Sequence, residues 1–124
     1  MDTSACYPYE TAVTAYGNGG FRFADMSHRG SILCLPSGVH AWGATASEAL
    51  EVSDFDFLFS ALEPPIIVLL GTGATQVWPR PEVYAAFSKA QIGLEPMSTG
   101  AAARTYNVLI AEKRRIAAAL IAVP

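Results

Sequence analysis

Hydrophobic and polar residues alternate over short segments in the first third of the chain, which is the period of a half-buried β-strand. The run Gly17-Asn18-Gly19-Gly20 interrupts this pattern with Asn-Gly and Gly-Gly pairs, which are typical of a hairpin turn with positive φ. Arg29-Gly30 and Pro36 mark further breaks. The pattern predicts four strands, at residues 13–16, 21–23, 31–35 and 39–42.

The spacing of apolar residues becomes helical after residue 52. The residues that follow the i, i+3, i+4, i+7 spacing are Phe55, Leu58, Phe59 and Leu62. Ser53 and Asp56 stand where the capping box of such a helix would be, and Pro64-Pro65 would end it. The segment therefore predicts one amphipathic helix.

An uninterrupted aliphatic run at residues 66–70 is bounded by Pro65 and Gly71, as is typical of a central strand covered on both faces. Pro81 suits the first turn of a helix that we expect to run to about Gln91. Gly93 follows that helix, and residues 94–97 are predicted to form another strand.

A last helix is predicted from about residue 101 to residue 122. Its apolar face would contain Ala102, Tyr106, Leu109, Ile110, Ala117, Leu120 and Ile121, with Arg104, Ala111 and Arg115 opposite. Lys113 does not fit this face, so either its stem reaches past the stripe to solvent or the stripe drifts in the last turns. Glu112 would pair with Arg115 along the helix.

The order of elements predicts an α/β fold in three layers, with a central mixed β-sheet flanked by helices and an N-terminal β-hairpin beside it. The strands at 66–70 and 94–97, joined through a helix, should be parallel neighbours with a right-handed crossover. A length of 124 residues predicts one domain over residues 1–124.

Composition supports a well-covered core, because 52% of residues are hydrophobic and only 15% are charged. It also predicts either an exposed apolar patch or a homodimer face. The net charge of −3 disfavours a nucleic-acid partner. The basic cluster at Lys113, Arg114 and Arg115 is better explained by the dipole of the last helix than by a patch for nucleic acid or an acidic partner.

No run is long enough to form a transmembrane segment, and residues 1–4 lack the pattern of a signal peptide. We therefore expect a cytoplasmic protein. Cys6 and Cys34 could form a metal site with His28 and His40, but free thiols in a reducing compartment are the favoured interpretation. We find no catalytic constellation and expect no cofactor.

The first candidate binding segment is Gly71-Thr72-Gly73, which follows the aliphatic strand. Ligands of α/β sheets bind at the carboxyl ends of strands, where glycine lets the backbone approach them. Gln76 stands where a dinucleotide fingerprint needs its third glycine, and no phosphate-binding P-loop follows. A structural turn is favoured over a ligand loop.

The second candidate is the strand-to-helix corner at residues 97–107. Ser98 and Thr99 can cap the helix, and the free amides with Arg104 could hold an anion or a carboxylate. Capping alone is slightly favoured. If both corners share a rim of the sheet, they form one cleft, whose residues would be Gly71, Thr72, Gly73, Ser98, Thr99, Arg104 and Asn107.

Several motifs together resemble one family. They are Gly19-Gly20-Phe21-Arg22, Gly30-Ser31-Ile32-Leu33, Trp42, Leu69-Leu70-Gly71-Thr72-Gly73 and the segment from Met97 to Leu109 that contains Arg104-Thr105-Tyr106-Asn107. The chain resembles, over about residues 13–122, the Mth-like domain family of largely unknown function. That family includes the mitochondrial NADH:ubiquinone oxidoreductase (complex I) assembly factor 3 and an adipogenesis-associated relative.

The resemblance implies a three-layer α/β fold and a non-catalytic protein-interaction role, with respiratory-complex assembly proteins as partners. It supplies no catalytic residue. Relatives often have an acidic residue at Ser98 and a cysteine at Ala103, so a chemistry that used either would be missing here. Because no mitochondrial presequence precedes residue 13, we expect a bacterial cytoplasmic member, peripheral to the inner membrane through its partners. The alternative function is a small-molecule or anion-binding domain, or an uncharacterised enzyme, that uses the cleft.

Overall fold

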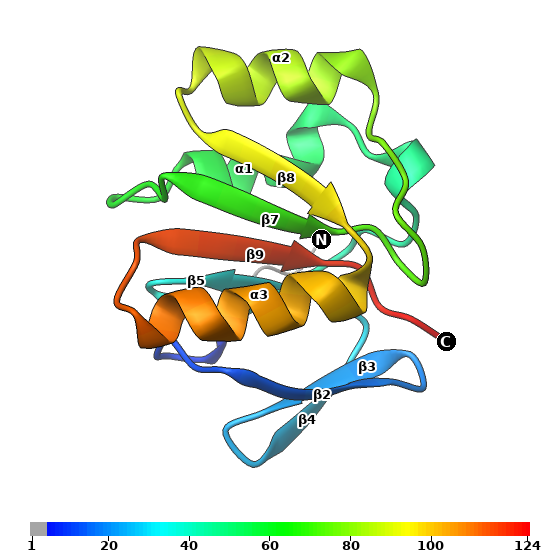
Figure 1. Cartoon of the computed structure of the whole chain (residues 1–124), viewed down its shortest axis with the longest axis vertical. Helices are drawn as coiled ribbons and strands as arrows, with labels where there is room; N and C mark the ends of the chain where they lie inside the picture. Colours follow the sequence, from blue (N-terminus) through cyan, green and yellow to red (C-terminus); the bar gives the residue numbers. More distant parts are fainter. Residues whose placement is uncertain (1–4) are drawn as a thin grey trace.

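The computed structural model describes residues 5–124, so the expectation about a signal peptide at residues 1–4 lies outside it. Six strands form a central sheet in the order β1-β6-β5-β9-β7-β8 (Figure 1). These strands are β1 (Ala5–Tyr7), β6 (Gly38–Trp42), β5 (Ser31–Leu35), β9 (Ile116–Leu120), β7 (Ile67–Gly71) and β8 (Gly93–Met97). A second sheet contains β2 (Val13–Gly17), β3 (Gly20–Phe23) and β4 (Met26–Arg29).

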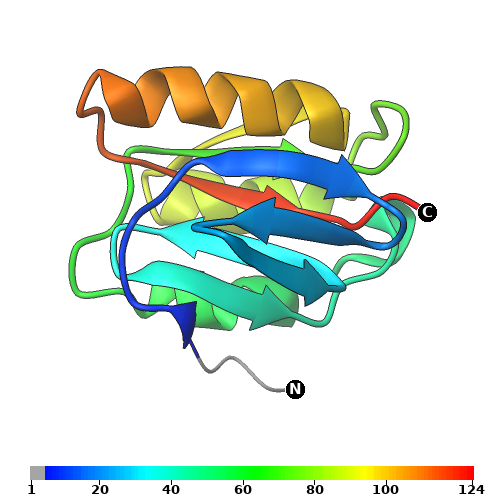
Figure 2. The same ribbon diagram turned by 90° about the horizontal axis from the view of Figure 1, so that it is seen from below.

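Helical segments cover both faces of the central sheet. They are the short η1 (Ser47–Ala49) and η2 (Val52–Phe55), α1 (Asp56–Phe59), α2 (Pro81–Lys89) and α3 (Thr99–Ala111). One apolar cluster lies between the central sheet and the helical segments η1, η2, α1 and α2. The other lies between the central sheet, α3 and the second sheet. In Figure 2 the second sheet lies in front of the central sheet, with β2 beside α3. The molecule therefore has three layers.

The predicted fold class is confirmed, because the central sheet is mixed. Strand β7 is parallel to β8 and β9, whereas β5 is antiparallel to β6 and β9. The N-terminal hairpin, β2–β3, is extended by β4, which the sequence did not predict. Ala24 and Asp25 form the connecting turn with φ of 49° and 60°. Alanine is not a usual residue for such a turn, so there was little indication of a hairpin at this point of the sequence.

The predicted last helix is wrong beyond residue 111. Helix α3 ends at Ala111, the chain turns with Lys113 at a φ of 59°, and Ile116–Leu120 forms β9 between β5 and β7. All five residues of β9 are buried. Three of them are alanines, which favour a helix by propensity, but this segment is buried on both faces like β7 and takes the central position in the sheet.

The basic cluster therefore does not lie in a helix. Lys113, Arg114 and Arg115 occupy the exposed connection between α3 and β9, which removes the conflict between Lys113 and the predicted apolar face. Glu112 lies 4.0 Å from the guanidinium of Arg114 instead of pairing with Arg115. Both partners are more than half exposed, so this ion pair contributes little to stability.

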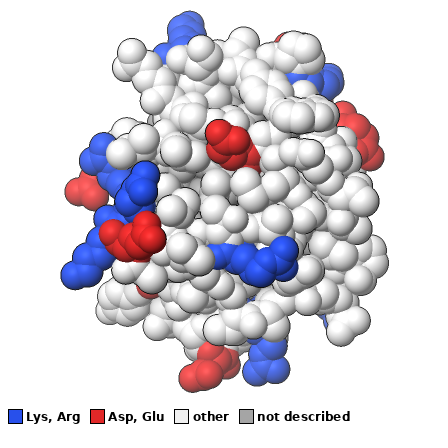
Figure 3. Space-filling view, viewed as in Figure 1, with Lys and Arg blue, Asp and Glu red and all other residues white. Residues whose placement is uncertain are grey.

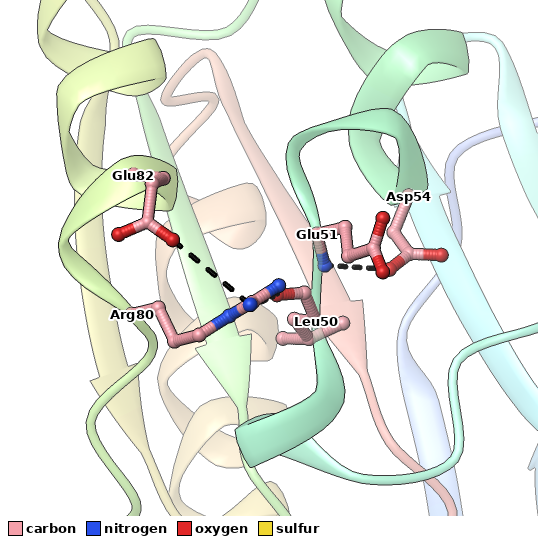
Figure 4. A network of polar contacts seen from close by, with 5 residues as sticks. All are labelled: Leu50, Glu51, Asp54, Arg80 and Glu82. Carbon is pink, nitrogen blue, oxygen red and sulfur yellow. Dashed lines mark hydrogen bonds and ion pairs between the residues drawn. The ribbon is translucent and has the colours of Figure 1, made fainter.

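The helix predicted over residues 55–62 is shorter than expected. Only Asp56–Phe59 is α-helical, after the 3₁₀ segment η2, and Leu62 is fully exposed rather than part of a buried stripe. The capping box uses Glu51 and Asp54, not Ser53 and Asp56 (Figure 4).

The side chain of Arg80 ties the start of α2 to the segment before η2. Its Nε and Nη2 donate to the carbonyl oxygen of Leu50, at 3.3 and 2.9 Å, and its Nη1 lies 3.9 Å from Glu82 (Figure 4). These bonds hold the connections on one side of the sheet together. Within residues 5–124, no helix has the length and apolar character needed to cross a bilayer.

Candidate functional site

The two predicted corners meet at one rim of the central sheet. In the register between β7 and β8, Gly71 stands opposite Met97, and the Thr72 N–H donates to the Met97 carbonyl at 2.8 Å. The Thr99 N–H donates to the Gly73 carbonyl at 2.8 Å. The prediction that the two parallel strands bring their glycine and threonine tips together is therefore confirmed.

Thr99 connects three segments at this rim. Its hydroxyl accepts from the Gly73 N–H at 3.0 Å and donates to the carbonyl of Ile121, just after β9, at 2.7 Å. The side chain is completely buried. A Cβ on Gly71 would lie 2.9 Å from the Thr99 Cα, so glycine is needed there for close approach of the two corners.

The other two hydroxyl groups of the rim also bond within the protein. The hydroxyl of Thr72 lies 2.7 Å from the Thr75 carbonyl and 3.1 Å from the Met97 carbonyl, and it accepts from the Val77 N–H at 3.0 Å. Ser98 is the N-cap of α3, and its Oγ accepts from the amide of the residue three further on at 3.3 Å. The prediction that Ser98 or Thr99 caps this helix is confirmed, with Ser98 as the cap.

Asn107 does not lie at the rim. It is two turns further along α3, about 12 Å away by helix geometry. Its Oδ1 accepts from the Val13 N–H at 2.9 Å and its Nδ2 donates to the Val13 carbonyl at 2.8 Å. Asn107 therefore satisfies the free edge of β2 at a position 94 residues away in sequence, which no local pattern could have indicated.

Arg104 is exposed on α3 and makes no ion pair within residues 5–124. Figure 3 shows that the face over α3 and β8 carries few charges, which gather instead where α3 turns into β9. The structure thus brings Gly71, Thr72, Gly73, Ser98 and Thr99 together. Their polar groups bond to one another and to neighbouring backbone groups, and ligand binding by them stays a prediction.

Two cavities lie away from this rim. One is a concave surface of about 480 Å³ on the three-stranded sheet, which includes the side chains of Arg22 and Arg29. The other is a cleft of about 370 Å³ between the β5–β6 turn and α1, with Phe57 and Leu62 in its wall. Neither was predicted, because each combines residues that the sequence assigned to separate strands, turns and helices.

The cysteines occupy different environments. Cys34 is buried in the core, and this burial raises the pKa of its thiol to about 12, so it stays protonated. Cys6 is half-buried, with its Sγ 3.5 Å from the His28 Nδ1. His40 contacts the hydroxyl of Ser37 through Nε2 at 2.9 Å. Within residues 5–124, no three His, Cys, Asp or Glu side chains come together as a metal-binding group.

Tyr106 is a buried polar residue within the motif that carries the family resemblance. Its hydroxyl has no hydrogen-bond partner within residues 5–124. Burial, with smaller contributions from Cys34 and Glu10, raises the pKa of this phenol above its ordinary value. The ring fills the space between α3 and the central sheet, and it cannot ionise at neutral pH.

Comparison with known proteins gives a consistent set of relatives. Residues 13–121 match the family described as proteins of unknown function (DUF498/DUF598). The chain is 36% identical over 115 residues to the zebrafish (Danio rerio) protein named NADH dehydrogenase [ubiquinone] 1 alpha subcomplex assembly factor 3. That match covers 92% of this chain but 66% of the relative, so the chain spans about two thirds of the assembly factor.

Two solved structures share the fold over nearly the whole chain. A protein of Bartonella henselae, named as an outer membrane protein, has a TM-score of 0.89 and 42% identity, covering 95% of this chain and 99% of that one. A Bordetella pertussis protein described as a Mth938-like domain has a TM-score of 0.75 and 30% identity, covering 90% of this chain and 85% of that one.

Proposed function

The chain belongs to the DUF498/DUF598 family, and from this premise we propose that it is a non-catalytic protein-interaction domain that assists the assembly of a respiratory complex. The observation that carries the proposal is the match to a complex I assembly factor across 92% of the chain. Because the chain spans about two thirds of that relative, the role of the whole relative is transferred here only as a proposal.

The geometry of the rim supports a non-catalytic role. The groups that a phosphate or a carboxylate would need, the Gly73 amide and the Thr99 and Thr72 hydroxyls, already have partners inside the protein. A catalytic site instead needs a nucleophile and a base within reach of each other and of a substrate. Here the arrangement holds β7, β8, β9 and α3 together.

The surface supports an interaction role. Leu62 is fully exposed beside the apolar cleft next to α1, and Trp78 is 66% exposed on the loop after β7. Exposed apolar side chains next to a cleft are typical of surfaces that contact other proteins. We propose respiratory-complex assembly proteins as the partners, with the domain in the bacterial cytoplasm and at the inner membrane through them.

Deleting the gene in the source organism tests this function. We expect the amount of assembled complex I, measured on blue-native gels, and NADH–quinone activity both to fall, with partly assembled complex accumulating. Succinate–quinone activity should stay unchanged, and the intact gene should restore complex I. Normal assembly of complex I in the deletion strain would refute the proposal. Fractionation of the same cells would test the location, since the Bartonella relative is named as an outer membrane protein.

The alternative function is binding of a small anion at the rim, with Arg104 as the cation. It is favoured by the exposed position of Arg104 and by the open space beside Gly73, where a Cβ would meet nothing within 4 Å. A panel of nucleotides and carboxylic acids tests it through thermal stabilisation. A ligand at one hundred times its Kd should add about 2.7 kcal/mol of stability. Arg104→Ala should remove that gain, and absence of any gain would exclude this function for the compounds used.

A further inference from the structure

We propose that the free edge of β4, with the outer face of the three-stranded sheet, binds an acidic extended segment of a protein partner by strand addition. This inference rests on the proposed interaction role and names the surface and the partner chemistry for it. It depends on three features of residues 13–30: the hydrogen-bonding direction of β4, the arginines beside it and the glycine-lined floor between them.

The backbone of β4 offers unused hydrogen-bonding groups. Because the turn at Ala24-Asp25 has two residues, Phe23 and Met26 exchange backbone hydrogen bonds. In an antiparallel ladder, hydrogen-bonded pairs alternate with pairs that do not bond to each other. The Gly30 N–H donates to the Gly19 carbonyl at 2.7 Å, as expected if every second residue of β4 bonds to β3. The N–H and C=O groups of Ser27 and Arg29 therefore point away from β3, toward the free edge.

Two other strand edges of the protein carry groups that obstruct strand addition. On β8, the Gly93 N–H and the Met97 carbonyl bond to the neighbouring segments, and this alternation leaves the backbone of Pro96 facing outward. Proline has no N–H to offer there, and its carbonyl accepts from the Gln76 Nε2 at 2.9 Å. On β2, Asn107 occupies both backbone groups of Val13. Strand β4 contains no proline, and no side chain of residues 5–124 caps the backbone of Ser27 or Arg29.

The side chains beside this edge are cationic. Arg22 stands opposite Ser27 and Arg29 stands opposite Gly20, so both arginines project from the same face of the sheet. Both are exposed, and neither forms an ion pair within residues 5–124. A terminal nitrogen of Arg29 lies 3.7 Å from the position that a Cβ on Gly19 would take, so its guanidinium extends across the sheet.

The floor between the arginines contains two glycines, which present no side chain at these positions. Gly17 and Gly20 face one another across β2 and β3, and a Cβ on Gly17 would meet nothing within 4 Å. The resulting concave surface of about 480 Å³ includes both arginines and the hydroxyl of Ser27. Glutamate or aspartate side chains on an added strand would reach the guanidinium groups from this face.

Charge selects the occupant of the edge. A second copy that paired β4 with β4 would bring Arg22 and Arg29 of both copies onto one short ladder, where like charges repel. An acidic segment meets the same arginines with attraction, and the edge supplies the main-chain hydrogen bonds. The whole protein has a net charge of −3, so the positive charge of this face is a local feature and not a property of the protein as a whole. An acidic partner strand therefore fits better than a second copy.

An eight-residue peptide of alternating glutamate and threonine, blocked at both ends, is the probe. All its glutamates lie on one face when it is extended. We expect amide shifts in ¹H–¹⁵N spectra to be largest at Ser27 and Arg29, and binding to weaken with salt. The same glutamate–threonine peptide with every backbone amide N-methylated keeps the charge but has no N–H donors, so it should bind at least tenfold more weakly. Equal binding of that peptide, equal binding of a lysine–threonine peptide, or shifts elsewhere would overturn the proposal.

Variants separate the charges from the edge. R22E/R29E should weaken binding of the glutamate–threonine peptide at least tenfold, whereas R114E/R115E, a matched reversal on the far connection, should leave it within twofold. If R22E/R29E does not fold, R22Q/R29Q, which removes both charges without reversing them, is measured in its place. Ser27→Pro removes one outward N–H without breaking the β3–β4 ladder and should weaken binding at least threefold. Unchanged affinity in either R22Q/R29Q or Ser27→Pro would refute strand addition at β4.

The same variants distinguish this inference from the proposed function. If R22E/R29E binds no peptide but restores complex I assembly in the deletion strain, the assembly role stands and β4 is not its docking surface. If deletion leaves complex I unchanged while the peptide still binds at β4, the docking surface stands and the assembly role fails.

Discussion

Replacing Thr99 by valine tests whether the rim is a structural joint. Valine keeps the shape of threonine but removes both hydrogen bonds of the hydroxyl, to the Gly73 N–H and the Ile121 carbonyl. Ile121 is only 2% exposed, so its carbonyl would lose its partner in a dry site, at a cost of about 1–3 kcal/mol. The half-buried Gly73 amide adds about 1 kcal/mol, because water can partly replace its partner. Thr99→Val should therefore destabilise the protein by roughly 2–4 kcal/mol.

Urea unfolding followed by tryptophan fluorescence measures this change. With about 2.1 cal/mol/K of unfolding entropy per residue, a loss of 2–4 kcal/mol lowers Tm by roughly 8–15 °C. Thr99→Ser keeps the hydroxyl and loses one methyl group, so it should cost only about 1 kcal/mol. Thr105→Val is the control on the same helix. This threonine is half-exposed and its hydroxyl joins no two segments within residues 5–124, so the change should alter stability by less than about 0.5 kcal/mol. If Thr99→Val is as stable as Thr99→Ser, the hydroxyl does not hold the corners together.

Three further predictions concern the core and its edges. Gly100→Ala should displace the half-exposed ring of Tyr16, because its Cβ would come within 2.2 Å of the Tyr16 hydroxyl, and this cost should offset the gain in helix propensity. In a Tyr16→Ala background the same change should stabilise the protein by about 1 kcal/mol, and a double-mutant cycle would measure the difference. Asn107→Ala should cost about 2 kcal/mol and speed hydrogen exchange along β2, and unchanged exchange there would contradict its role as an edge cap. Alkaline unfolding tests the buried thiol and phenol: burial raises the pKa of Cys34 from 9.0 to about 12 and the pKa of Tyr106 above its ordinary 10.0. Above pH 9 the unfolded chain releases the thiol proton that the folded chain keeps. The free energy of unfolding should therefore fall by about 1.4 kcal/mol per pH unit, and by about twice that above pH 10. Cys34→Ala should remove the decline between pH 9 and 10, and a flat profile in the intact chain would refute the assignment.

The strands at the rim could be predicted because their sequences are locally consistent. The aliphatic run of β7 is bounded by proline and glycine, and the helix between β7 and β8 implies parallel neighbours that end at one edge. Strand β9 has no such local signal. Its Ala117-Ala118-Ala119 core favours a helix by propensity, and only its position between β5 and β7 determines that it is a strand.

The roles of polar residues were less predictable than their positions. The sequence placed Ser98 and Thr99 at a helix start but could not distinguish a capping or bridging hydroxyl from a ligand group. The difference depends on where Ile121 lies, and that follows from the strand position of β9. The contact between Asn107 and Val13 likewise depends on how β2 packs against α3. Tertiary contacts of this kind leave no pattern within a single segment.

The residues that carry the family resemblance act mainly on the fold. Gly71 allows close approach of Thr99, and the hydroxyl of Thr99 joins β7 to the end of β9. Gly100 leaves room for a tyrosine ring, and Asn107 closes the edge of β2. A chain can therefore keep these residues because the fold needs them, whatever it binds. Members of the family that bind different partners should then differ on surfaces that these contacts do not use, and Ser27 and Arg29 of β4, which lie outside the shared motifs, belong to such a surface.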